Sequence, residues 1–110
     1  MNQLDFEKSV EKQIDYSKNL LFIKGDEYKR KVEDRLKYFK DAAKLMDITP
    51  KEALAGMMSK HTISIYSMCK DDKKYSLDKW TEKITDHINY LFLLKAMIEE
   101  EDLNSEEYSN

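Results

Sequence analysis

Residues 80–98 of this 110-residue chain are WTEKITDHINYLFLLKAMI, and their hydrophobic spacing decides the fold class. Apolar side chains recur three or four positions apart, the spacing that places them on one face of an α-helix. These side chains are Trp80, Ile84, Ile88, Leu91, Leu94 and Ile98. We therefore expect a helix here, and Ser76 is a suitable residue to cap its first turn.

The preceding helix is predicted over residues 50–69. Its start is signalled by Thr49, whose side chain can cap the first turn, by Pro50 in that turn, and by Glu52, which can return a bond to the cap backbone. One side of this helix carries Leu54, Met57, Met58, His61, Ile65 and Met68. The charged run at 70–74 then forms a solvated loop.

Two further helices are predicted in the first half of the chain. The first, over 4–23, has Phe6, Val10, Ile14 and Leu21 on one face, and Gly25 is expected just beyond its end. The second, over 26–46, has a seam made of Tyr28, Val32, Leu36, Phe39, Ala43 and Met46. Four helices with short connections predict an all-α fold, a four-helix antiparallel bundle in residues 1–98. Apolar residues off these stripes, Leu45, Phe92 and Leu93, predict assembly as a homo-oligomer.

Charge separates the body of the chain from its C-terminal end. The formal net charge is −3, but residues 99–110 hold six carboxylates and no Lys or Arg, so residues 1–98 carry +3. We expect the acidic tail at 99–110 to be disordered. The mildly basic body permits an anionic ligand, but it lacks the dense Lys/Arg stripe of a protein that binds duplex nucleic acid.

Neither a membrane span nor a secretion signal is predicted, because no apolar run approaches roughly 18 residues and no basic segment leads into an apolar one. The lone Cys69 cannot form an internal disulfide, which favours a reducing compartment such as the cytoplasm. Cys69 is expected to be a small buried apolar residue.

Three of the predicted helices carry groups of polar residues that could bind a ligand or take part in catalysis. On the last helix Glu82, Asp86 and Asn89 share a face that Lys83 and Tyr90 border. The other two groups are Lys60, His61 and Ser64, and Asp34, Arg35 and Lys40. Burying Asp86 or Asn89 without a partner would cost on the order of 2–7 kcal/mol, so these side chains should be exposed, paired or directed at a ligand.

Two interpretations of these groups remain open. If they converge, Arg35 and Lys60 would bind phosphate while Asp86 and Asn89 contact a ribose or a base. Alternatively, each group is an ordinary solvated surface in a chain that is 37% charged, and His61 is a hydrogen-bonded core histidine.

Three segments also carry a family resemblance. They are KGDEYKRKVEDRLKYFKDAAKL at 24–45, TPKEALAGMMSKHTISIYSM at 49–68 and WTEKITDHINYLFLLKA at 80–96. Together they resemble a family of small helical proteins of uncertain function, encoded mainly by bacteriophages and prophages. The recurring positions of that family correspond to Asp34, Arg35, Phe39, Lys60, His61, Ser64, Glu82, Lys83, Asp86, Asn89 and Tyr90. Tyr38 departs from the pattern, which has a small polar residue there.

The last segment is also distantly similar to the acidic helix of MazG-like all-α nucleotide pyrophosphohydrolases. The resemblance implies Mg²⁺ held by paired acidic motifs on an oligomeric helical bundle. That family has E-x-x-D on this helix, whereas here Lys83 stands three positions before Asp86, and Glu82 lies one residue further back. This departure puts metal-dependent hydrolysis in doubt, since Mg²⁺ needs several oxygen ligands.

Three hypotheses for the function follow. The first is a phage-type protein in the host cytoplasm that binds a nucleotide without a cofactor and sequesters a nucleotide signal of antiviral defence. The second is a Mg²⁺-dependent pyrophosphohydrolase, with Glu82, Asp86 and Asp34 on the metal and His61 or Lys60 assisting phosphate. The third is a helical adaptor whose apolar faces and acidic tail bind another protein.

Overall fold

The protein is all-α in the computed structural model, which describes the backbone of residues 1–29 and 34–109 and the side chains of 1–23 and 34–105. These ranges contain four helices and no strand, as the sequence predicts. The helices are α1 (Gln3–Lys29), α2 (Lys37–Met46), α3 (Pro50–Lys70) and α4 (Leu77–Ser109). None of the described helices has an apolar stretch long enough to cross a bilayer.

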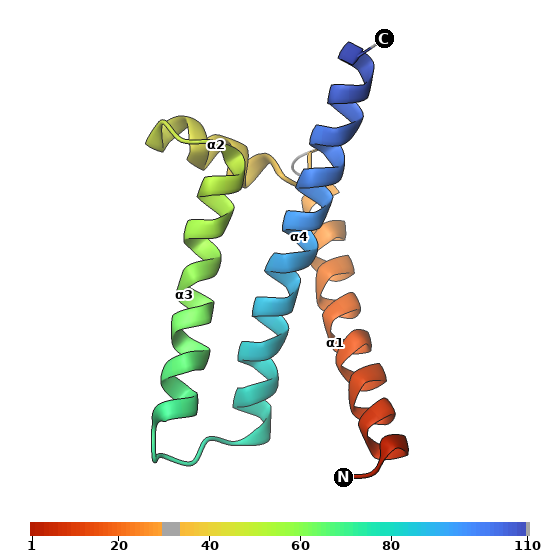
Figure 1. Ribbon diagram of the computed structural model, residues 1–110, viewed down its shortest axis with the longest axis vertical. Helices are drawn as coiled ribbons and strands as arrows, with labels where there is room; N and C mark the ends of the chain where they lie inside the picture. Colours follow the sequence, from red (N-terminus) through yellow and green to blue (C-terminus); the bar gives the residue numbers. More distant parts are fainter. Residues whose placement is uncertain (30–33, 110) are drawn as a thin grey trace.

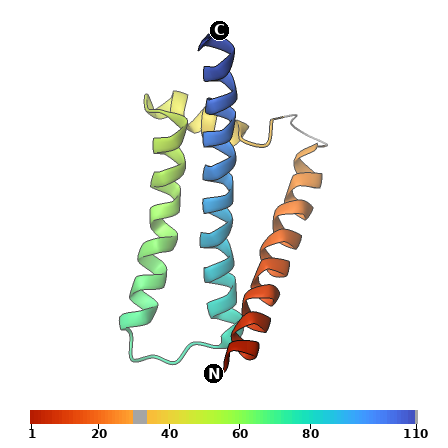
Figure 2. The same ribbon diagram turned by 45° about the vertical axis from the view of Figure 1, so that its right-hand side comes forward.

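Helix α4 is the central element of the fold. It lies between α3 and α1 in both views, and it packs against each of them (Figures 1 and 2). Helix α3 runs in the opposite direction to α4, whereas α1 runs in the same direction. The short α2 lies across the upper end of the structure and packs on α3. Helices α1 and α3 therefore each cover one side of α4.

The predicted starts of α3 and α4 are confirmed. The backbone N–H of Glu52 donates to Thr49 Oγ1, and the backbone N–H of Thr49 donates to Glu52 Oε1, both at 3.2 Å, so a full capping box precedes Pro50. Ser76 Oγ accepts from the backbone N–H of Lys79 at 3.1 Å. Local hydrogen bonds set both helix starts, which is why short sequence signals predict them.

The boundary between the first two helices differs from the prediction. Helix α1 continues through Gly25 to Lys29, since a glycine inside a helix costs only about 1 kcal/mol relative to alanine. Helix α2 begins at Lys37 instead of residue 26. Before it, the Asp34 carboxylate accepts from the N–H of Leu36 at 2.9 Å and the Asp34 carbonyl accepts from that of Lys37 at 3.1 Å. This turn competes with helix, so Asp34 and Arg35 precede α2.

The hydrophobic core lies where α2, α3 and α4 meet. It is formed by Leu36, Phe39, Leu54 and Met97, with Met57, Tyr90, Leu93 and Leu94 packed around them. The predicted seam of the second helix contributes Leu36, Phe39 and Ala43 to buried positions, but Met46 is exposed. Tyr28 and Val32 lie outside the described side chains.

The predicted apolar stripe of α1 does not pack into the core of the single chain. Phe6, Val10 and Ile14 are 53%, 41% and 52% exposed, and Leu21 is half-buried. Instead Ser17, which is 1% exposed, turns toward α4. A hydrogen bond to Thr85 of α4 and the half-buried Leu20 and Leu21, which line a cavity together with Leu93 of α4, hold α1 in place.

Two expectations for the C-terminal half are corrected. Residues 99–109 continue the helix of α4 instead of forming a disordered tail. Glu100 pairs with Lys40 at 2.6 Å and Glu101 pairs with Lys51 at 3.1 Å, so the acidic segment is held against α2 and α3. Cys69 is exposed rather than buried, and the adjacent Met68 occupies the buried side of α3 instead.

Candidate functional site

A buried polar seam joins α1 to α4. Gln13 Nε2 donates to Thr85 Oγ1 at 2.8 Å and to Ser17 Oγ at 3.2 Å. Ser17 and Thr85 are 1% and 5% exposed. Hydroxyl groups this deeply buried normally have hydrogen-bond partners, and here Gln13 supplies them. The seam fixes the position of α1 beside the first third of α4.

Asn89 continues this seam one turn along α4, but its carbonyl oxygen has no partner. The side chain is 7% exposed, and among the buried side-chain atoms of the described residues only Asn89 Oδ1 lacks a hydrogen bond. An unsatisfied buried acceptor costs about 1–3 kcal/mol. Such a group calls for a specific explanation, and a bound hydrogen-bond donor is one.

A cavity of about 140 Å³ lies beside Asn89, between α1, the start of α2 and α4. Its apolar wall is formed by Leu20, Leu21, Phe39 and Leu93. Its polar wall is formed by Arg35, Tyr38, Asp86, Asn89 and Tyr90. The cavity thus combines a cation, a carboxylate, an amide and two phenols with an apolar floor, the composition expected of a small-ligand site.

The aromatic residues of the cavity are held by other rings. The rings of Phe39 and Tyr90 meet edge to face with their centroids 6.2 Å apart. On its other side Tyr90 contacts His61, at 4.8 Å between centroids and with the planes tilted by 38°. Tyr38 packs edge to face on Phe39 at 5.8 Å. His61 does not line the cavity, but its ring packs against Tyr90 and helps to hold the phenol of Tyr90 in place there.

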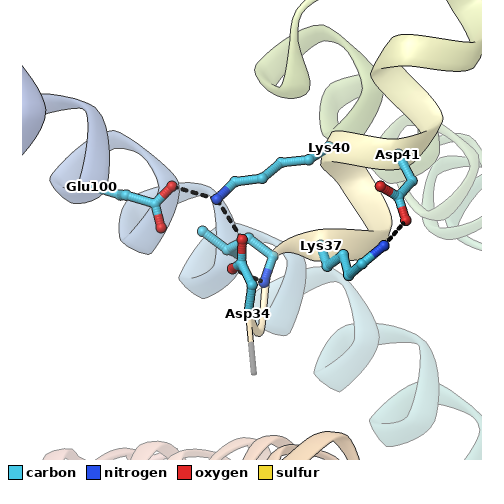
Figure 3. A network of polar contacts seen from close by, with 6 residues as sticks. Asp34, Lys37, Lys40, Asp41 and Glu100 are labelled. Atoms are coloured by element: carbon cyan, nitrogen blue, oxygen red, sulfur yellow. Dashed lines mark hydrogen bonds and ion pairs between the residues drawn. The ribbon is translucent and has the colours of Figure 1, made fainter. Parts of the chain in front are cut away.

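Asp34 lies next to Arg35 but serves a structural network rather than the cavity wall (Figure 3). Lys40 Nζ lies 2.6 Å from Asp34 Oδ2 and 2.6 Å from Glu100 Oε1, so it connects the turn before α2 to α4. The hydrogen bond from Lys40 lowers the pKa of Asp34, and the backbone N–H of Leu36 acts in the same direction. Two hydrogen bonds raise the pKa of Lys40, and the bond to Asp34 has a larger effect than the bond to Glu100. This network holds the backbone that carries Arg35.

The structure brings together four of the ten predicted site residues. Arg35, Asp86, Asn89 and Tyr90 line one cavity. The other six are Asp34, Lys60, His61, Ser64, Glu82 and Lys83, and none of them lines its wall. Of these, Lys60 and Glu82 are exposed, while Ser64 and Lys83 are half-buried. The convergence of three helices that the sequence predicts thus involves α1, α2 and α4 instead of α2, α3 and α4.

Several residues of the site were not singled out in the sequence. Leu21 was expected on the apolar stripe of the first helix and Leu93 on an oligomer contact, whereas no sequence signal pointed to Leu20. Tyr38 appeared only as a departure from a family pattern. Gln13 and Ser17 offered a usable signal, since two polar residues four positions apart share a helix face. That signal was hidden beside the apolar stripe of the same helix.

The acidic side chains that the structure describes do not gather into a Mg²⁺ site. Among the side chains of residues 1–23 and 34–105, no group of three or more His, Cys, Asp or Glu is placed to hold a metal ion. Glu82 is exposed, Asp86 lines the cavity and Asp34 is engaged with Lys40. These positions do not fit a cation that takes several oxygen ligands at once.

Comparison of the chain with protein-family models, with curated proteins and with solved structures found no match.

Proposed function

We propose that this protein binds a nucleotide, or a similar small molecule that joins a planar ring to a phosphate, in the cavity between α1, α2 and α4. The observation that carries the proposal is Asn89 Oδ1, a buried acceptor without a partner at the wall of that cavity. An amino or ring N–H group of a base would supply the missing donor. Asp86, on the same wall, offers a second acceptor for a base or a ribose hydroxyl.

The size of the cavity supports a ring-sized occupant. A protein cavity of about 150 Å³ holds one benzene ring, and this one measures about 140 Å³. Tyr38 and Tyr90 line it, and aromatic side chains of this kind stack on planar bases. We therefore place the base inside and the phosphate at the mouth, where Arg35 can contact its oxygens with a planar pair of donors.

Binding is favoured over hydrolysis on the residues present. The acidic side chains that the hydrolase hypothesis assigns to Mg²⁺ do not gather in one described copy of the chain. The resemblance to phage proteins supports the biological setting that we propose, sequestration of a nucleotide signal of antiviral defence in the host cytoplasm. The exposed apolar residues of α1 and α4 support the further proposal that the chain works as a homo-oligomer.

Isothermal titration calorimetry against linear and cyclic nucleotides, nucleosides and inorganic phosphate tests the ligand. We expect at least one nucleotide to bind, and its nucleoside and phosphate alone to bind more weakly. Asn89→Leu and Arg35→Ala should each weaken that binding by about tenfold or more, equivalent to about 1.4 kcal/mol. Lys60→Ala is the matched control, because Lys60 is exposed and does not line the cavity.

Two outcomes would overturn this proposal. If no nucleotide binds, the unsatisfied amide does not mark a nucleotide site. If Lys60→Ala reduces binding as much as Asn89→Leu does, the ligand lies elsewhere on the chain. Recovery of the ligand intact after denaturation distinguishes sequestration from hydrolysis.

A further inference from the structure

A third face of α4 is exposed, apart from those that meet α1 and α3. Thr85 faces α1 through its bond with Gln13, and Tyr90 faces α3 through its contact with His61. The third face carries an aliphatic residue at every seventh position, namely Leu77, Ile84, Leu91 and Ile98. Their exposed fractions are 77%, 38%, 48% and 46%. We call these four residues the α4 stripe. Leu77, at the start of α4, also borders α1 across an open pocket.

The α4 stripe has the length and the spacing of a helix-pairing surface. From Leu77 to Ile98 an α-helix rises about 32 Å, at 1.5 Å per residue. A seven-residue repeat keeps side chains directed at a partner helix along a supercoil. Phe92, which is 51% exposed, adds apolar surface beside the stripe. Lys95 lies between Leu91 and Ile98 on this face, and its ammonium group pairs with Glu99. Exposed apolar side chains repeated along one face of a soluble protein favour a contact site.

We propose that the α4 stripe joins two copies of this chain, with α4 packed antiparallel against α4 of the second copy. A two-fold interface uses the same patch on both partners, so the patch must match itself after rotation. The α4 stripe meets this requirement when the two-fold axis passes between His87 and Ile88. In that register Leu77 lies opposite the partner's Ile98, and Ile84 lies opposite the partner's Leu91.

Charge selects the antiparallel direction over the parallel one. Residues 99–102 are all acidic, and a parallel pair would place these two segments side by side. In the antiparallel register they lie at opposite ends of the dimer. The same arrangement directs each acidic segment toward the end of the partner where α4 begins, next to the loop that carries Lys73 and Lys74 as well as Asp71 and Asp72. Repulsion between the two acidic segments is therefore avoided.

The proposed dimer makes a bundle that one chain lacks. The α3–α4 pairs of two copies would form four helices with antiparallel neighbours, which bury the stripe between them. Tyr66, 64% exposed, lies one turn of α3 beyond the Thr62–His87 hydrogen bond and would extend this contact. The dimer specifies the homo-oligomer proposed above and rests on that part of the proposed function. The ligand cavity is on another face of α4, that of Asp86 and Asn89, so dimerisation does not depend on nucleotide binding.

Analytical ultracentrifugation of the full chain tests the dimer. We expect a species of twice 13.1 kDa at micromolar concentrations. The double variant Ile84→Glu with Leu91→Glu should sediment as a monomer and keep its helical circular dichroism. Leu45→Glu, on an exposed apolar residue of α2 away from the stripe, should leave the dimer intact. A parent chain that stays monomeric up to millimolar concentration, or a double variant that still dimerises, would overturn the proposal.

Disulfide cross-linking tests the register without charged substitutions that threaten folding. In a Cys69→Ser background, chains with Ile84→Cys are mixed with chains with Leu91→Cys under mild oxidation. The antiparallel register predicts efficient cross-linking between the two kinds of chain and poor cross-linking of either kind alone. Equally efficient cross-linking of each variant with itself would indicate parallel pairing and contradict our inference.

Discussion

Gln13 and Thr85 stand 72 positions apart in the sequence, yet Gln13 Nε2 donates to Thr85 Oγ1 at 2.8 Å inside the α1–α4 contact. This bond connects the first helix to the central one through polar atoms, while the apolar stripe of α1 stays exposed. Thr85→Val removes the acceptor at nearly constant volume. We expect the free energy of unfolding to fall by about 1–2 kcal/mol.

Hydrogen exchange should locate this loss in α1. Because α1 packs on α4, the amides of residues 6–23 are expected to exchange faster in Thr85→Val, while those of α3 change less. Ser59→Ala is the control, since its hydroxyl bonds only to the carbonyl of Gly56 within an exposed turn of α3. Uniform acceleration across all helices would contradict a local role for this bond.

Asn89 is one helical turn from Thr85, but its substitution should act in the opposite direction on stability. Asn89→Leu replaces a buried acceptor that has no partner by an apolar group of similar size. We expect unfolding of the unliganded protein to require about 1–2 kcal/mol more, measured by urea denaturation. The same variant should lose ligand binding, because a polar group that serves function in a core often lowers the stability of the protein. A destabilised Asn89→Leu would mean that the amide oxygen is already satisfied.

Stability at acidic pH should depend on Asp34. Its pKa is lowered in the folded state, chiefly by the bond from Lys40, so it stabilises the fold above its ordinary value of 3.8. That contribution is lost as the pH falls below 3.8 through the lowered pKa, where protonation breaks the bond. Denaturation of Asp34→Asn between about pH 2 and pH 7 should therefore show a shallower decline than the parent. The control is Asp41→Asn, which removes the exposed pair with Lys37 inside α2 and should leave the profile unchanged.

The capping box before α3 gives a fourth prediction. Thr49→Ala removes the acceptor for the backbone N–H of Glu52, and we expect a loss of about 1 kcal/mol in the free energy of unfolding. Thr49→Ser keeps the hydroxyl and should retain most of the stability. Equal losses in the two variants would show that the methyl group, rather than the cap, matters at this position.

Sequence signals that depend on residues close together in the chain predicted part of this structure well. The starts of α3 and α4 depend on hydrogen bonds within four residues, at Thr49 and at Ser76, and the end of α2 at Met46 was also expected. The start of α2 was missed because the Asp34 side chain bonds to the backbone of Leu36 and forms a turn. A periodic apolar pattern does not reveal such a side-chain bond, and the pattern through Tyr28, Val32 and Leu36 suggested an unbroken helix.

The candidate site was only partly predictable for a related reason. Asp86 and Asn89 stood out as polar residues in an apolar helix, and the structure places both at the cavity with Arg35 and Tyr90. The expected contribution of Lys60 from α3 does not reach the cavity, whereas Leu20 and Leu21 of α1 line it. Spacing along a helix defines which residues share a face, but it does not define which other helix that face meets.

The sequence by itself determined the all-α class, four helical segments and the caps of the last two, because those features arise from hydrogen bonds and side-chain spacing within a few residues. Tertiary structure alone decided that α1 meets α4 through Gln13 and Ser17 while Phe6, Val10 and Ile14 stay exposed, and that the carbonyl oxygen of Asn89 is buried without a partner. Both depend on pairing between residues far apart in the chain. The free energy of a buried polar group is set by the partner that the fold places against it.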